Sequence, residues 1–128
     1  MVSRITNSVK ITVLTEYDAK NSFPSENRFV FRYTITIENL REDSIRLLKR
    51  KWLIYDVGFG FTEVSGDGVI GLTPEIKPGE HFSYFSHVVL HSGVGNMSGN
   101  YLFRNTLTEE NFEAVIPKFN LHSGVLSN

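Results

Sequence analysis

The stretch Arg28-Phe-Val-Phe-Arg-Tyr-Thr-Ile-Thr-Ile-Glu-Asn39 decides the fold. From 29 to 37 its odd positions carry aromatic or isoleucine side chains, whereas its even positions, apart from Val30, are polar or charged. Successive side chains of a strand point to opposite faces of a sheet, so this alternation creates one apolar and one polar face. A helix would scatter both sets around its axis. The stretch therefore predicts a long central strand of an antiparallel sheet with one buried face.

The rest of the chain repeats this pattern in shorter pieces separated by turn residues. Further strands are expected over 9–13, 45–56, 61–65, 82–90, 97–104 and 112–116, with Pro117 ending the last one. The alternation slips at 49–51, which predicts a β-bulge or a crossing between sheets. Trp52 is expected to anchor the core. About seven to eight short antiparallel strands predict an all-β fold, an immunoglobulin-like or fibronectin type III-like β-sandwich, in a single domain over 1–128.

Composition limits the classes of partner. Thirteen basic and fourteen acidic side chains leave a formal charge of −1, so no global field favours nucleic acid, and no nucleic-acid partner is expected. The absence of cysteine excludes disulfides and thiolate metal sites. The N-terminus lacks the apolar core of a secretory signal, and no window is long and apolar enough for a membrane span. We expect a cytoplasmic protein with no membrane association.

The segment Gly66-Asp-Gly-Val-Ile-Gly71 spells the dinucleotide-binding pattern G-x-G-x-x-G. That site requires the glycine loop to open a helix whose amides hold the pyrophosphate. Pro74 and Pro78 follow too closely for such a helix, so we reject this interpretation and expect no cofactor. Gly66, Gly68 and Gly71 are better explained as turn or strand glycines, and a nest of backbone amides that binds an anion is the remaining alternative.

Neither a metal site nor a catalytic site is indicated by the sequence. His81, His87 and His91 share strand parity, but their spacing along one strand separates His87 from His91 by about 13 Å and from His81 by about 20 Å. His122 lies far from them in the sequence, and no metal-binding motif is present. There is no G-x-S-x-G nucleophile elbow and no cysteine nucleophile. We therefore expect no metal site and no enzyme activity.

Two other sets of residues are candidates for binding. Arg28, Arg32, Arg46 and Arg50 could form a basic patch for phosphate, although a solvated sheet face explains them equally well. Phe59 and Phe61 flank Gly60 at an expected hairpin tip, where apolar side chains are difficult to bury. An exposed aromatic tip would indicate a partner-binding surface, whereas Phe61 folded inward would be core.

The chain resembles the ApaG proteins along essentially its whole length. The stretch 27–39 is similar to their signature strand, and the other matching segments follow in order: 47–54 (LLKRKWLI), 66–71 (GDGVIG), 78–80 (PGE), 95–101 (GNMSGNY) and 112–117 (FEAVIP). This resemblance implies a fibronectin type III-like fold. Bacterial ApaG proteins are linked genetically to cobalt and magnesium efflux, and the domain in eukaryotic F-box and polymerase-interacting proteins is regarded as a protein–protein interaction module.

These observations predict a non-catalytic protein–protein interaction domain, and the resemblance to the ApaG proteins implies a link to cobalt and magnesium homeostasis. The partner would be another protein or, in a homodimer, a second copy of the chain. The alternative is a small-ligand module that binds phosphate, pyrophosphate or a divalent cation near the glycine segment and the basic strand face.

Overall fold

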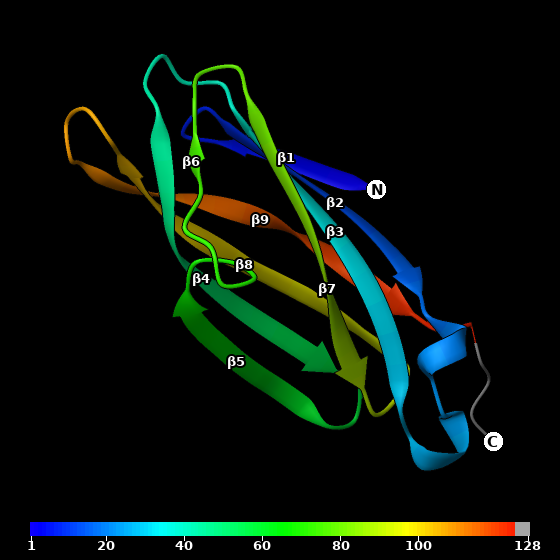
Figure 1. Cartoon of the computed structure of the whole chain (residues 1–128). Coiled ribbons are helices and arrows are strands. Elements are labelled where there is room, and N and C mark those ends of the chain that lie inside the picture. Colours follow the sequence, from blue (N-terminus) through cyan, green and yellow to red (C-terminus); the bar gives the residue numbers. More distant parts are fainter. Residues whose placement is uncertain (125–128) are drawn as a thin grey trace.

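The computed structural model describes residues 1–124 and arranges them in two stacked antiparallel sheets (Figure 1). Sheet one has the strand order β1 (Val2–Thr6), β2 (Val9–Tyr17), β3 (Phe29–Asn39) and β7 (His81–Leu90). Sheet two has the order β5 (Gly60–Asp67), β4 (Ile45–Asp56), β8 (Val94–Asn105) and β9 (Asn111–His122), and the short β6 (Glu75–Ile76) also pairs with β4. This architecture confirms the predicted all-β sandwich.

The connections contain little other regular structure. Two 3₁₀ turns, η1 (Ala19–Asn21) and η2 (Pro24–Glu26), join β2 to β3. Within residues 1–124 there is no α-helix, and correspondingly no helix that is long and apolar enough to cross a membrane.

Strand β3 is the central element of sheet one, as its alternation predicts. Its odd residues from Phe29 to Ile37 are buried, and Ile35 pairs with Val13 on one side and with Tyr84 on the other. Aromatic and β-branched residues fit such a half-buried pleated surface well. Trp52 lies opposite in the core, with its ring centroid 5.4 Å from that of Tyr33 and 5.9 Å from that of Phe119. The prediction that Trp52 anchors the core is confirmed.

The predicted slip in β4 is a β-bulge, and it determines which side chains face the core. The register with β8 shifts between Leu47 and Lys49. Ile45 and Leu47 are buried before the bulge, whereas Trp52 is buried after it, so the inward parity changes from odd to even. Arg50 therefore shares the inner side of sheet two with Trp52, and Lys49 and Lys51 point outward.

Three features of the fold differ from the sequence expectation or were not foreseen. The prediction that Pro117 ends the last strand is wrong, because β9 continues to His122. A register shift opposite Met97 and Gly99 places Pro117 at an irregularity, where a missing N–H is tolerated. Strands β1 and β6 were not predicted. β1 packs along β9 and so closes one side of the sandwich, whereas β5 and β7, the end strands of their sheets, leave the other side open.

Candidate functional site

The glycine segment forms a tight turn after β5. Val69 and Leu72 each donate a backbone N–H to the carbonyl of the other at 2.8 Å, and the two residues between them have φ of 45° (Ile70) and 77° (Gly71). Left-handed conformations at both central positions are typical of a type I′ hairpin turn. Gly66 lies in β5, and no helix follows Gly71 as far as residue 124, as the sequence predicts.

The backbone amides of this turn are largely occupied. Gly68 N–H donates to the Leu48 carbonyl at 2.8 Å, and the amides of Val69 and Leu72 are bonded within the turn. Gly68 has φ of 59°, and a Cβ there would overlap the Leu72 carbonyl oxygen. The glycines therefore shape a compact turn, and the geometry lends little support to an amide nest for phosphate.

Arg50 holds the turn against the sheet. Its Nη1 donates to the carbonyl oxygens of Asp67 and Gly68 at 2.9 and 3.0 Å. The guanidinium lies directly over Gly66, where a Cβ would approach its atoms to 2.7 Å. A side chain at Gly66 would therefore displace the Arg50 guanidinium. The two hydrogen bonds engage only one nitrogen of that arginine.

The open side of the sandwich contains a cleft of about 370 Å³ between β5 and β7, which we call the inter-sheet cleft. Its apolar lining comes from both sheets and from the turn: Trp52, Ile54, Val64, Val69, Ile70, Val88 and Met97. Its polar lining residues are Tyr33, Arg50, Tyr84, Ser86 and His87. None of the residues that line the cleft, all within the described part of the chain, is Asp or Glu.

Three tyrosine hydroxyls meet beneath the cleft. The hydroxyls of Tyr84 and Tyr101 form a short hydrogen bond, and Tyr33 lies beside Ser86, its partner in the β3–β7 register. Burial raises the pKa of Tyr33 and Tyr84 and raises the pKa of fully buried Tyr101 well above its usual value. All three phenols therefore keep their protons at physiological pH and act as hydrogen-bond donors.

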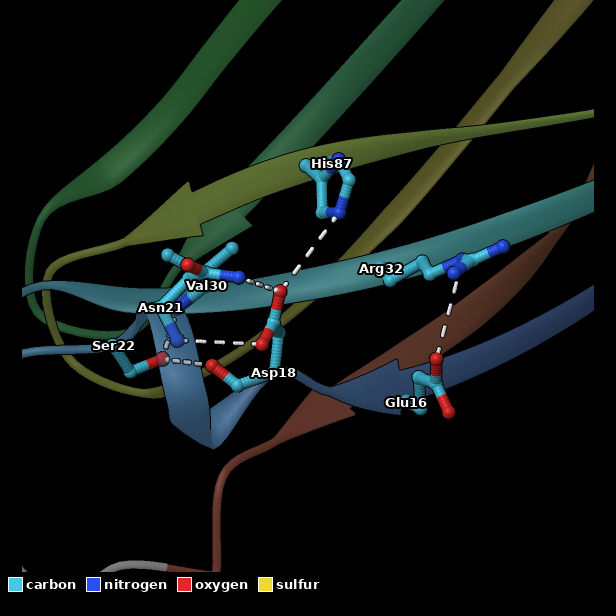
Figure 2. A network of polar contacts seen from close by, with 7 residues as sticks. All are labelled: Glu16, Asp18, Asn21, Ser22, Val30, Arg32 and His87. Carbon is cyan, nitrogen blue, oxygen red and sulfur yellow. Dashed lines mark hydrogen bonds and ion pairs between the residues drawn. The ribbon is translucent and has the colours of Figure 1, made fainter.

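His87 lies at the border between the cleft and a polar network around η1 (Figure 2). Its Nε2 is 3.9 Å from Oδ2 of Asp18, as the upper dashed line in Figure 2 shows. The Asp18 carboxylate also accepts hydrogen bonds from the backbone and side-chain nitrogens of Asn21, and the side-chain bond is the main cause of the lowered pKa of Asp18. Ser22 Oγ accepts from Val30 N–H at 2.8 Å and ties the network to β3. His87 is therefore positioned by a structural turn.

The structure does not bring the four predicted arginines together. Arg32 lies on the outer face of sheet one, 4.0 Å from Glu16 and stacked on the Phe85 ring at 4.0 Å (Figure 2 shows the contact with Glu16). Arg46 lies on sheet two and contacts Thr73 and Glu75. Arg28 precedes β3 and bridges to Phe23. Of the four, Arg50 is the one that meets the glycine segment.

The predicted aromatic tip is exposed. Phe59 and Phe61, at the turn between β4 and β5, are 62% and 66% accessible to solvent. The Phe61 ring lies 4.6 Å from that of Tyr55, its partner in the β4–β5 register, and Phe59 lies 5.2 Å from the His91 ring. Leu53, two residues before Tyr55 and on the same outer face of β4, is also exposed. We call Leu53, Tyr55, Phe59 and Phe61 the aromatic tip.

Asp56 fixes the base of the aromatic tip. Its carboxylate is almost fully buried and accepts hydrogen bonds from the backbone N–H of His91 at 2.7 Å and of Ser92 at 3.0 Å, and from Ser92 Oγ at 2.5 Å. Val57 N–H donates to the Val94 carbonyl at 3.0 Å. The turn that carries the two phenylalanines is therefore joined to the β7–β8 turn by several bonds.

The predicted histidines do not assemble into a metal site. In the part of the chain that the structure describes, no three His, Cys, Asp or Glu side chains come close enough to hold a metal ion. Sequence reasoning also missed the inter-sheet cleft, because its residues come from five strands and a turn, and no local spacing reports their proximity.

Comparisons with known proteins identify close relatives. The family model described as "ApaG domain" matches residues 19–105. "Protein ApaG" of Shewanella halifaxensis is 42% identical over 94% of this chain and 94% of its own length. "Protein ApaG" of Yersinia pseudotuberculosis is 43% identical over 87% of this chain and 88% of its own. The crystal structure of the "Putative ApaA Protein from Bordetella pertussis" superposes with a TM-score of 0.87 at 33% identity, covering 91% of this chain and 94% of that one. None of these names describes a reaction.

Proposed function

The chain belongs to the ApaG domain family, and we propose that it is a non-catalytic protein-binding domain whose partner docks on the aromatic tip. The observation that carries this proposal is the exposure of two phenylalanine rings, at 62% and 66%, of which Phe61 packs on Tyr55, with further exposed apolar surface from Leu53. Burying one such ring contributes about 1.5–3 kcal/mol, enough for the centre of an interface.

The rigidity of the tip supports the same proposal. Phe61 packs against Tyr55, and Asp56 joins the turn to the neighbouring β7–β8 turn through hydrogen bonds. A surface that is already held in place loses little conformational entropy on binding, so more of the apolar burial is retained as affinity.

Strand β5 adds a second mode of contact. Within the described residues it pairs only with β4, so its outer edge offers unpaired backbone groups next to Phe61. An extended segment of a partner, or β5 of a second copy, could extend sheet two there. Under this proposal any role in cobalt or magnesium homeostasis is indirect and exercised through the protein partner.

The test compares a tip variant with a matched surface variant. We expect Phe59→Ser/Phe61→Ser to fold normally but to lose self-association in sedimentation velocity, or to lose the protein that wild type captures from its native cell. Phe85→Ser is the control, because Phe85 is 51% exposed but lies on β7 in sheet one. Equal association of wild type, tip variant and control contradicts the proposal, as does unfolding of the tip variant.

A further inference from the structure

The inter-sheet cleft combines free hydrogen-bond donors with an apolar lining. The two bonds to the turn use only Nη1 of Arg50, so Nε and Nη2 have no partner within residues 1–124. The cleft is therefore short of acceptors on the protein side, because no carboxylate belongs to its lining.

Tyr84 provides a second donor that is independent of Arg50. The Tyr101 hydroxyl is fully buried and has Tyr84 as its hydrogen-bond partner. Because a buried donor without an acceptor is costly, we assign the Tyr101 proton to this bond. Each hydroxyl carries one proton, which leaves the Tyr84 proton unused by this bond. Tyr84 lines the cleft although it is only 6% exposed. Its hydroxyl proton can therefore reach an acceptor that binds in the cleft. A buried donor is stabilised when a ligand supplies an acceptor.

We propose that the inter-sheet cleft binds a monocarboxylate that carries an apolar group, with the carboxylate against Arg50 and Tyr84 and the apolar group against Trp52, Val64 and Met97. This site is separate from the aromatic tip, so the proposal does not rest on the proposed function.

Charge and size favour this ligand over phosphate or pyrophosphate. Arg50 brings one fixed positive charge to the cleft, and the nearby His87 faces Asp18. The cleft therefore balances the single negative charge of a monocarboxylate but not the several charges of phosphate or pyrophosphate. The planar guanidinium fits the two oxygens of a carboxylate. A volume of about 370 Å³ lies at the small end of ligand-binding pockets and suits a group of one ring or one side chain. The carboxylate can come from a free acid or from the C-terminal residue of a peptide.

The test follows amide resonances of the ¹⁵N-labelled chain during titration with phenylacetate. We expect saturable shifts confined to residues around the cleft, with a dissociation constant on the order of 1 mM for so small a ligand. Phenylacetamide and pyrophosphate should each bind at least about tenfold more weakly, because one lacks the charge and the other the apolar group. Titration with N-acetylglycyl-phenylalanine distinguishes the sources, since tighter binding than phenylacetate assigns the site to peptide C-termini.

Variants localise the site. Arg50→Gln should weaken phenylacetate at least about tenfold. Arg46→Gln should change the affinity less than about twofold, because Arg46 also holds a carbonyl of the connection after β5 but does not line the cleft. Since Arg50→Gln also loosens the turn, Val64→Trp provides a second test: it fills the cleft from an edge strand while Arg50 itself is retained, and it should abolish the shifts. Equal affinity for acid and amide, undiminished binding in Val64→Trp, or no saturable shift at 20 mM overturns the proposal.

Discussion

Removing the hydroxyl of Tyr84 should destabilise the protein more than removing that of Tyr101, although the two hydroxyls form the same hydrogen bond. Tyr101 is fully buried, so we assign its hydroxyl as the donor of this bond, whereas Tyr84 lies at the cleft. Tyr84→Phe leaves the Tyr101 proton without an acceptor inside the core. Tyr101→Phe leaves a Tyr84 hydroxyl that can bond to water in the cleft.

The magnitudes follow from the cost of a buried unsatisfied group. Tyr84→Phe should lower the free energy of unfolding by about 1–3 kcal/mol, the penalty for a buried donor without a partner. Tyr101→Phe should lower it by about 0.5–1.5 kcal/mol, the net value of an ordinary hydrogen bond. The double variant should lose less than the sum of the two by about 1 kcal/mol, because the second substitution removes the group that the first left unpaired.

Urea unfolding measured by tryptophan fluorescence provides the assay. Trp52 is the single tryptophan, and its ring contacts that of Tyr101 edge-on at 6.5 Å, so it reports on this part of the core. Tyr55→Phe, at the partly exposed aromatic tip, is the control and should change the free energy of unfolding by less than about 0.5 kcal/mol. A larger loss in Tyr101→Phe than in Tyr84→Phe, or strict additivity, would refute the assigned direction of the bond.

Three further predictions concern stability. Ile35→Ala should lower the free energy of unfolding by about 2–5 kcal/mol, because Ile35 is fully buried; its control, exposed Ile5→Ala, should change it by less than about 0.5 kcal/mol, and equal losses would contradict the burial argument. Because burial raises the tyrosine pKa values, the folded state holds these protons more tightly than the unfolded state. Their contribution is constant below about pH 10 and is lost as the pH rises further. Urea unfolding between about pH 9 and 11 should show this fall, and an equally steep fall in Tyr84→Phe/Tyr101→Phe would contradict it. Gly68→Ala should lower the free energy of unfolding by more than about 1 kcal/mol, because its φ is positive and the new Cβ would overlap the Leu72 carbonyl oxygen. Gly71→Ala should lower it by less, because φ is also positive there but the space for a Cβ is open. Thermal melting that reverses this order would contradict the account.

The sequence predicts those parts of the fold that have a short-range period. The alternation in β3 identifies the buried face, the slip at 49–51 identifies the bulge, and Pro74 and Pro78 exclude a helix after Gly71. Strand β1 could not be predicted in this way, because its residues are mostly exposed and show no alternation of apolar and polar side chains. Pro117 misleads because a β-bulge can accommodate a proline in a strand.

The sequence predicts a candidate site only where residues that are neighbours in the chain determine its geometry. The glycine-flanked position of Phe59 and Phe61 already indicates an exposed tip, since a tight turn leaves large side chains no core to enter. The contact of Arg50 with the glycine segment depends on the bulge, which reverses the parity of β4, and on the pairing of Arg50 with Gly66 across two strands. Likewise, the hydroxyls of Tyr84 and Tyr101 meet across the two sheets, a long-range relation that no sequence period encodes.

Photo-crosslinking from the aromatic tip tests the central claim most directly. A photoreactive phenylalanine analogue at position 61 keeps the ring in place, and the same analogue at position 85 serves as a control on sheet one. The account predicts that irradiation in the native cell joins position 61, but not position 85, to one defined protein or to a second copy of the chain. Crosslinks of equal yield and identity from both positions, or none from position 61, would contradict it.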